Sequence, residues 1–280
     1  MMKKTDLSLT LFQTGYCVHP EKVTVKDGSW KKVKFPALVG LIEHPEKGYI
    51  LFDTGYAEHF FAASRKFPYS IYPKVTPVYF EDEQSIKNQL SAKGIYPEDI
   101  SYIIISHFHG DHIGGLLDFP KSTYICFKRA YQFIKDKKGF SAIKNGYLPD
   151  LLPKDFLERV IFLEEGDGSQ LSDDFSPFTE GWDIFQDGSL FAVDLTGHAI
   201  GQMGIFLHDS KMDCVFLCAD ACWQSRAYRE KVFPNPLAYL IMPDVRSYQE
   251  NLIRLHQLHE HHPKWKILPT HCQEIWRNDQ

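Results

Sequence analysis

Short apolar runs, separated by turn residues, recur along the first half of the chain. In the first run, Leu7, Leu9 and Leu11 alternate with polar residues, which is the period-two pattern of a strand with one buried face. Glycine, proline and charged residues separate this run from those that follow. The runs predict β-strands over residues 7–15, 35–44, 48–56, 96–106 and 122–127.

The second half of the chain repeats this alternation of apolar runs and helical patterns. Its runs predict strands over residues 190–198, 201–209, 213–220 and 264–271. Apolar residues at helical spacing, with Gly94 closing the first pattern, predict helices over residues 82–95, 128–139 and 247–263. Two similar β/α halves favour two packed sheets with helices outside.

Between the two halves, residues 141–188 break the pattern. This segment is rich in Asp, Gly, Pro and aromatic residues, and we expect it to be irregular. Its apolar residues, such as Leu151, Phe156 and Trp182, are too frequent for a solvated tether. We therefore expect an insertion that covers an active site, within a single domain formed by residues 1–280.

The bulk composition argues against several classes of protein. The chain has 280 residues, a net charge of −5 and no basic block, so it lacks the electrostatic footprint of a nucleic-acid binder. Its N-terminal segment has no continuous apolar stretch of the signal-peptide kind, and no run approaches the roughly 20 apolar residues of a membrane span. The six cysteines contain no C-x-x-C pair, which favours free thiols in a reducing compartment. These features predict a soluble cytoplasmic protein, and they are compatible with a homo-oligomer.

The strand predicted over residues 96–106 leads into a cluster of metal-binding residue types, in the sequence SHFHGDH. His107, His109, Asp111 and His112 offer imidazole nitrogens and a carboxylate, which suit Zn²⁺ and related metals. The glycines around them allow the backbone to turn closely. A histidine-rich surface loop is the simpler alternative, but such a loop has no reason to follow a fully apolar strand. The cluster therefore predicts a metal site.

Three further predicted strands end in a residue that can bind a metal. The run AVDLTGH ends in His198, VFLCAD ends in Asp220 and KILPTH ends in His271. Any one of these residues could be a polar group that caps a strand end or faces solvent. This explanation is much weaker for four strands that all end in a metal-binding residue type, counting the strand before His107. We therefore interpret them as the rest of one metal centre.

In this order, the motifs FDTG, SHFHGDH, TGHAIGQ, CAD and LPTH resemble those of the metallo-β-lactamase superfamily of hydrolases. The resemblance spans residues 5–275, nearly the whole chain. It implies an α+β fold, a four-layer αββα sandwich, with a two-metal site between the sheets. It also implies two divalent metal ions, Zn²⁺ first, with Fe, Mn or Co as alternatives. The implied ligands are His107, His109 and His198 on one metal, Asp111, His112 and His271 on the other, and Asp220 on both.

Within the superfamily, the chain looks most similar to the N-acyl homoserine lactone lactonases. This resemblance implies a small-molecule substrate with a lactone or ester carbonyl, which a metal-bridging hydroxide attacks while Asp111 or Asp220 takes and returns the proton. Such lactonases often carry a tyrosine three positions after the bridging aspartate, where this chain has Trp223. Indole donates a hydrogen bond but is no phenolic acid, so Tyr228 is a candidate substitute. Asp53 is a candidate partner for the free ring nitrogen of a ligand histidine, or it shapes the DTG turn.

Other functions remain open at this point. A thioester or phosphodiester hydrolase would use the same residues, and so would a single-iron persulfide dioxygenase or a binding protein without activity. A di-iron oxygen-reducing protein would need a carboxylate in place of His109. Several aromatic residues are candidates for an acyl pocket, although core packing explains them equally well: Phe60, Phe61, Tyr69, Tyr72, Tyr147 and Trp182.

Overall fold

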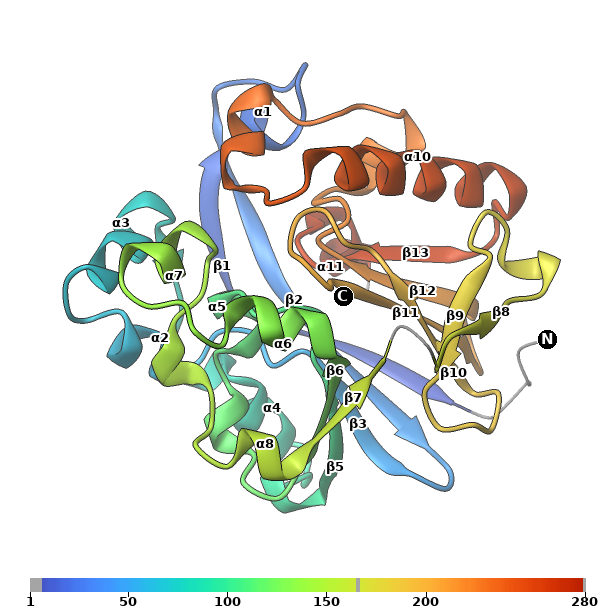
Figure 1. The fold of residues 1–280 in the computed structure, drawn as a ribbon, viewed down its shortest axis with the longest axis horizontal. Coiled ribbons are helices and arrows are strands. Elements are labelled where there is room, and N and C mark those ends of the chain that lie inside the picture. The colour runs from blue at the N-terminus through green and yellow to red at the C-terminus, as the bar shows by residue number, and fades with distance from the viewer. Residues whose placement is uncertain (1–6, 165–166, 279–280) are drawn as a thin grey trace.

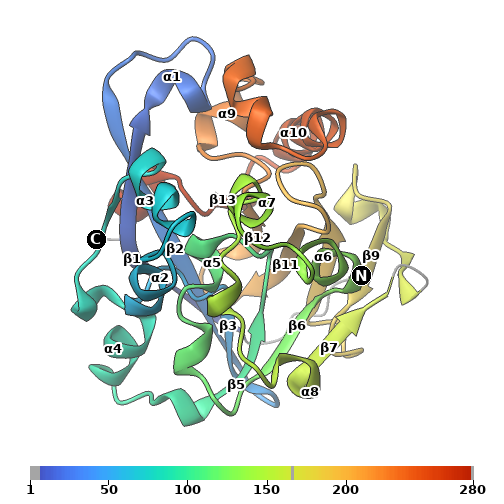
Figure 2. The same ribbon diagram turned by 60° about the vertical axis from the view of Figure 1, so that its left-hand side comes forward.

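The computed structural model describes residues 7–164 and 167–278. Two β-sheets pack face to face, with α2, α4, α6 and α8 against the first sheet and α9 and α10 against the second (Figure 1 and Figure 2). This arrangement confirms the expected α+β class and the four-layer αββα sandwich. Within the two described ranges, no helix is long and apolar enough to cross a membrane.

The first sheet has seven strands in the order β4-β1-β2-β3-β5-β6-β7. Strands β1 to β3 form antiparallel pairs, whereas β3, β5, β6 and β7 run parallel to one another. The strands are β1 (Ser8–Pro20), β2 (Lys32–His44), β3 (Gly48–Phe52), β4 (Val78–Tyr79), β5 (Ile100–Ile104), β6 (Thr123–Phe127) and β7 (Val160–Leu163).

The second sheet has six strands in the order β13-β12-β11-β10-β9-β8. All of its neighbours are antiparallel except β12 and β13, which are parallel. The strands are β8 (Ser169–Gln170), β9 (Glu180–Asp183), β10 (Leu190–Asp194), β11 (Met203–Asp209), β12 (Asp213–Ala219) and β13 (Lys266–Pro269).

Most helices are short, and α10 is the long exception. The first six are α1 (Glu21–Thr24), α2 (Glu58–Ala63), α3 (Tyr72–Val75), α4 (Ile86–Ser91), α5 (Gly110–Ile113) and α6 (Lys128–Ile134). The others are α7 (Phe140–Lys144), α8 (Phe156–Arg159), α9 (Ser225–Arg229), α10 (Val245–His261) and α11 (Gln273–Asn278). The Asp244 carboxylate accepts a hydrogen bond from the backbone N–H of Ser247 at 3.0 Å and caps the start of α10.

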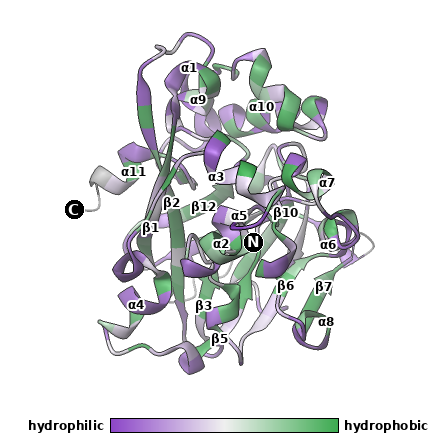
Figure 3. Cartoon of the chain, turned by 90° about the vertical axis from the view of Figure 1, so that its left-hand side faces the viewer, coloured by the Kyte–Doolittle hydropathy of each residue, from purple (hydrophilic) through white to green (hydrophobic). Residues whose placement is uncertain are grey.

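Both faces of the second sheet are buried, and this explains its continuous apolar runs. In β11, Ile205 faces the core between the sheets, whereas its neighbour Phe206 belongs to the cluster under α10. The α10 leucines at positions 252, 255 and 258, at helical spacing, pack into that second cluster. In Figure 3, α10 carries both hydrophilic and hydrophobic colours, as a helix with one buried face does.

We expected the segment 141–188 to be irregular, and this expectation was wrong. The segment supplies strands to both sheets. It contains α8, β7, β8 and β9, of which β7 and β8 are edge strands. These elements are two to four residues long, too short for a period to appear in the sequence. The aromatic residues of the segment serve the core, since Phe156 stacks on Tyr124 and the Trp182 ring contacts Phe127 edge-on.

Candidate metal centre

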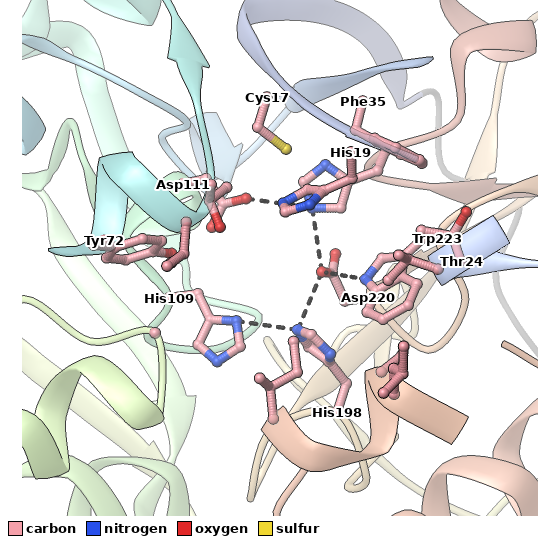
Figure 4. A pocket seen from close by; sticks show the side chains of 18 of the residues that line it. Cys17, His19, Thr24, Phe35, Tyr72, His109, Asp111, His198, Asp220 and Trp223 are labelled. Carbon is pink, nitrogen blue, oxygen red and sulfur yellow. Dashed lines mark hydrogen bonds and ion pairs between the residues drawn. The ribbon is translucent and has the colours of Figure 1, made fainter. Parts of the chain in front are cut away.

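The candidate centre lies where the carboxyl ends of strands from both sheets meet. Strands β1, β3 and β5 share one direction in the first sheet, and β10, β12 and β13 share one direction in the second. A cavity of about 350 Å³ opens at this edge. Figure 4 shows His109, Asp111, His198 and Asp220 pointing into it, the first two from the loop after β5 and the others from the chain after β10 and after β12.

The SHFHGDH motif forms the loop after β5 and the short helix α5. Gly110 is required there, because a Cβ atom at this position would lie 2.9 Å from the Phe60 ring. Gly146 packs against the His109 ring and must also be a glycine. It has φ +60, and a Cβ atom there would lie 2.6 Å from that ring. The backbone N–H of Gly110 also donates to the Gly146 carbonyl at 2.9 Å. The start of the 141–188 segment thus holds the His109 ring in place.

One group of potential ligands consists of His107, His109 and His198, which offer nitrogens that lie within 4.8 Å of one another. His198 Nε2 lies 3.0 Å from His109 Nδ1. A second group consists of Asp111, His112 and His271, within the same limit. A third group, formed by His107, His112 and Asp220, meets the same limit and links the first two.

Asp220 connects the two groups. Its Oδ2 atom lies 3.2 Å from His198 Nε2 and 3.2 Å from His271 Nε2. Its Oδ1 atom lies 3.3 Å from His112 Nε2. This carboxylate therefore occupies the position that a bridging ligand requires.

Backbone and side-chain partners fix the histidine tautomers on the second group. The Nδ1–H of His112 donates to Asp53 Oδ2 at 2.7 Å, and the Nδ1–H of His271 donates to the Pro36 carbonyl at 2.7 Å. Asp53 is itself held, because Ser106 donates its backbone N–H at 2.8 Å and its hydroxyl at 2.7 Å to the two carboxylate oxygens. In their neutral forms, both rings thus turn an Nε2 lone pair toward the cavity, as metal ligands do.

The electrostatics of the first group favour neutral imidazoles. Burial lowers the pKa of His109 to about 4 and that of His198 to about 3. Burial, together with the neighbouring histidines, also holds the pKa of His107 well below its usual range. Neutral imidazole is the form that binds a metal.

The second group is governed by its carboxylates. Burial opposes a charge on His112 and His271, but the neighbouring carboxylates, of which Asp220 contributes most, together outweigh burial and raise the pKa of both rings. Burial likewise opposes the charge on Asp220, but the two histidines hold the pKa of that carboxyl well below its usual value. The negative charge in this group therefore attracts cations, and a metal ion would replace the protons.

The spacing of the donor atoms fits metal ions. Four ligands at the usual zinc distances form a tetrahedron with edges of about 3.3 Å. The observed separations are 3.0 Å between His109 and His198, 3.2 Å from Asp220 to His198 or His271, and 3.4 Å between His271 and Asp111. In addition, His107 Nε2 and Asp220 Oδ1 are buried without a hydrogen-bond partner. These nitrogen and oxygen donors suit Zn²⁺ and similar divalent ions.

Of the two residues expected to contact substrate, the structure brings only Trp223 to the cavity. Its indole N–H donates to Asp220 Oδ2 at 3.1 Å, and its ring contacts His198 edge-on. Tyr228 does not line the cavity. Its hydroxyl donates to the Ile267 carbonyl at 3.2 Å, and its ring packs in the cluster under α10, which corrects the expected role.

The sequence did not single out every residue of the cavity. Cys17 and His19 line it because β1 continues to Pro20, beyond the predicted strand end. The alternation of the first residues of β1 breaks after Leu11, and the register of β1 against β2 shifts between Gln13 and Tyr16, so the sequence pattern did not extend to Cys17 and His19. Of the six aromatic residues considered for an acyl pocket, Tyr72 alone lines this cavity. Burial and the charge of Asp111 raise the pKa of its phenol well above the usual value.

A model of the metallo-beta-lactamase superfamily matches residues 34–260. The chain belongs to the metallo-beta-lactamase superfamily. The comparison extends to relatives that share the whole domain. N-acyl homoserine lactonase AttM of Azorhizobium caulinodans is 30% identical over 249 residues, covering 88% of this chain and 88% of that protein. The protein of the same name from Rhizobium radiobacter is 27% identical over 277 residues, covering 98% and 96%.

Solved structures of two lactone-hydrolysing proteins share the fold of this chain. An N-acyl homoserine lactone hydrolase with the product N-hexanoyl-L-homoserine bound at its catalytic metal center has a TM-score of 0.71 at 20% identity, covering 99% of this chain and 97% of that one. AidC, a dizinc quorum-quenching lactonase, has a TM-score of 0.66 at 17% identity, covering 98% and 90%. The chain is thus a hydrolase of the metallo-beta-lactamase superfamily, of the lactonase type.

Proposed function

We propose that this hydrolase opens the ring of N-acyl homoserine lactones or closely related lactones, at a centre of two divalent metal ions. The observation that carries the proposal is the position of Asp220, whose Oδ2 atom lies 3.2 Å from one histidine of each ligand group. Two cations held there would lower the pKa of a shared water and polarise the substrate carbonyl. We assign His107, His109 and His198 to one ion, Asp111, His112 and His271 to the other, and Asp220 to both.

The carboxylates of the centre supply the proton chemistry. Asp111 and Asp220 both line the cavity. When water adds to the carbonyl carbon, either carboxylate can accept its proton. The bond between that carbon and the ring oxygen then breaks, and the proton returns to the ring oxygen, which leaves as an alcohol. The product is the open-chain hydroxy acid.

The walls of the cavity support a substrate with an acyl chain. The centre lies at the floor, and the walls and mouth are largely apolar, with Val75, Leu237 and Ile241 exposed by 60%, 57% and 53%. An apolar tail lying on these side chains would bury surface worth about 25 cal/mol per Å². Thioesters or phosphodiesters would meet the same metal ions, but a phosphodiester gains less from apolar walls.

We further propose zinc as the metal and a reducing compartment such as the cytoplasm. The nitrogen-rich donor set supports zinc, although the same donors accept iron, manganese or cobalt. All six cysteines lie in the described part of the chain as free thiols, and this supports a reducing compartment.

The test is metal analysis together with turnover of a lactone panel. We expect the purified protein to hold two metal ions per chain and to open acyl homoserine lactones faster than thioesters or phosphodiesters. His198→Ala should lose metal and activity. His208→Ala is the matched control, because His208 pairs with Asp213 at 2.8 Å at the far edge of the sheet and lies outside the ligand groups. A wild type without metal would refute the whole proposal, and a metallated wild type without lactone turnover would refute the substrate.

A further inference from the structure

We propose that Tyr72 is a catalytic residue whose hydroxyl donates a hydrogen bond to the leaving ring oxygen of the substrate. This inference rests on the proposed ester or lactone hydrolysis, and it adds a substrate contact that the sequence motifs do not contain. Among the described residues, the side of the cavity that carries Trp223 and Thr24 offers no unengaged hydroxyl or indole donor.

On that side, the available groups are already engaged. The Trp223 N–H donates to Asp220 Oδ2 at 3.1 Å, so it holds the candidate bridging carboxylate instead of a substrate. The Tyr228 hydroxyl is bonded to a strand carbonyl at 3.2 Å outside the cavity. The Thr24 hydroxyl lines the cavity, but it donates to the Glu21 carbonyl at 2.9 Å.

The opposite wall carries the phenol. Tyr72 is the first residue of α3, is 8% exposed and lines the cavity. Figure 4 shows it beside Asp111 and above His109, across the cavity from Trp223. Among the tyrosines that the structure describes, it is the one on the cavity wall.

Packing holds the Tyr72 ring in one orientation. The ring meets Phe60 edge-on, with 5.3 Å between centroids, and Phe60 is fully buried. Phe60 and Tyr72 both press on Gly110, where a Cβ would lie 2.9 Å from one ring and 3.3 Å from the other. The loop that carries Asp111 therefore fixes the phenol next to that carboxylate. A donor fixed in this way needs no reorganisation during the reaction.

The neighbouring carboxylate decides which substrate atom the phenol meets. Asp111 lies 3.4 Å from His271 and can return the proton to the leaving oxygen. Because Tyr72 lies beside Asp111 in Figure 4, we place the leaving oxygen between these two side chains. A phenol donates one hydrogen bond, and this bond strengthens as the ring oxygen gains negative charge while its bond to the carbonyl carbon breaks.

The test compares Tyr72→Phe with wild type on lactones and on esters whose leaving groups range from p-nitrophenol to simple alcohols. We expect kcat for lactones to fall about 10- to 100-fold with KM changed little, because the contact forms mainly in the transition state. The loss should shrink toward p-nitrophenyl esters, since their leaving oxygen needs little stabilisation. Metal content and thermal stability should match wild type.

Tyr69→Phe is the matched control, because Tyr69 accepts a hydrogen bond from the Gly139 N–H at 3.0 Å and lies off the cavity. It should leave kcat unchanged. An unchanged kcat in Tyr72→Phe, or a loss that is equal for every leaving group, would overturn the assignment. If the wild type cleaves esters but no lactones, the lactone proposal fails, and the ester series still tests Tyr72.

Discussion

Replacing Asp53 with asparagine should weaken one metal site and spare the other. The carboxylate accepts the His112 Nδ1–H at 2.7 Å and two hydrogen bonds from Ser106, at 2.7 and 2.8 Å. An amide keeps one oxygen and replaces the other with a donor, so at least one of these three hydrogen atoms faces an NH₂ group. Mutating the hydrogen-bond partner of a metal-bound histidine typically lowers the metal affinity 10- to 100-fold, which corresponds to about 1.4 to 2.7 kcal/mol of binding free energy. We expect a loss of this size at the ion bound by His112.

The assay is a competition between the protein and a chelator of known affinity, with both binding steps resolved. The wild-type protein should release its two ions at similar concentrations of free chelator. The Asp53→Asn variant should release one of its ions at a free chelator concentration that is 10- to 100-fold lower. Asp209→Asn is the control, because Asp209 is equally buried and accepts backbone N–H groups from Leu9 and Met212 at 2.7 and 2.6 Å at the other end of the sheet. Unchanged release of both ions from Asp53→Asn, or equal weakening in the control, would refute the reasoning.

Three further predictions concern residues away from the metal ligands. Tyr228→Phe should lower the free energy of unfolding by about 1 kcal/mol through the lost hydrogen bond to β13 and leave kcat unchanged, so a collapse of activity would contradict its placement outside the cavity. Gly55→Ala should destabilise the protein by more than about 1 to 2 kcal/mol in urea unfolding, because Gly55 has φ +64 and a Cβ there would lie 1.7 Å from Thr14 Oγ1. The hydrogen bond to Asp118 raises the pKa of His59 above 6.5 in the folded protein, so its stabilisation is complete below that pH and disappears as the pH rises through the folded value. The difference in unfolding free energy between wild type and His59→Asn should therefore be larger at pH 5.5 than at pH 9, and an equal difference would contradict the assignment.

The elements that carry the candidate ligands were predictable because each is a buried strand followed by a polar residue. The predicted strand ends before His107 and Asp220 lie close to those observed, since β5 and β12 are buried on both faces and read as continuous apolar runs. Within each sheet, strands that run in the same direction bring their carboxyl ends to one edge, and the packing of the two sheets brings these two edges together. The assignment of each ligand to a metal came from the superfamily resemblance, and the spacing of residues alone does not contain it.

Other parts of the fold were not predictable for physical reasons. The strands β7 and β9 have four residues each, and β8 has two, so no hydrophobic period develops in them. The α5 helix has four residues and is set by the ligand loop rather than by helix propensity. Tyr228 was expected at the cavity because it follows Asp220 closely in sequence, but α9 turns its ring toward α10 instead. Closeness in sequence to Asp220 was therefore a poor predictor of the position of Tyr228, because the chain changes direction after β12.

Trp223 stands where the resemblance to the lactonases leads us to expect a tyrosine, and its contacts offer a physical explanation. The indole N–H donates to Asp220 and stabilises the carboxylate between the two ligand groups, whereas a phenol at this position could give its one hydrogen bond to the substrate instead. The proposed reaction gains from a donor near the leaving oxygen, but this donor need not follow β12. A rigid phenol on the opposite wall satisfies the same need, and Tyr72 is held there by Phe60 and Gly110. The double variant Trp223→Tyr with Tyr72→Phe distinguishes the two positions. If the donor is interchangeable between the walls, the double variant should recover part of the activity that Tyr72→Phe alone loses, and no recovery would mean that the position of the donor relative to Asp111 is decisive.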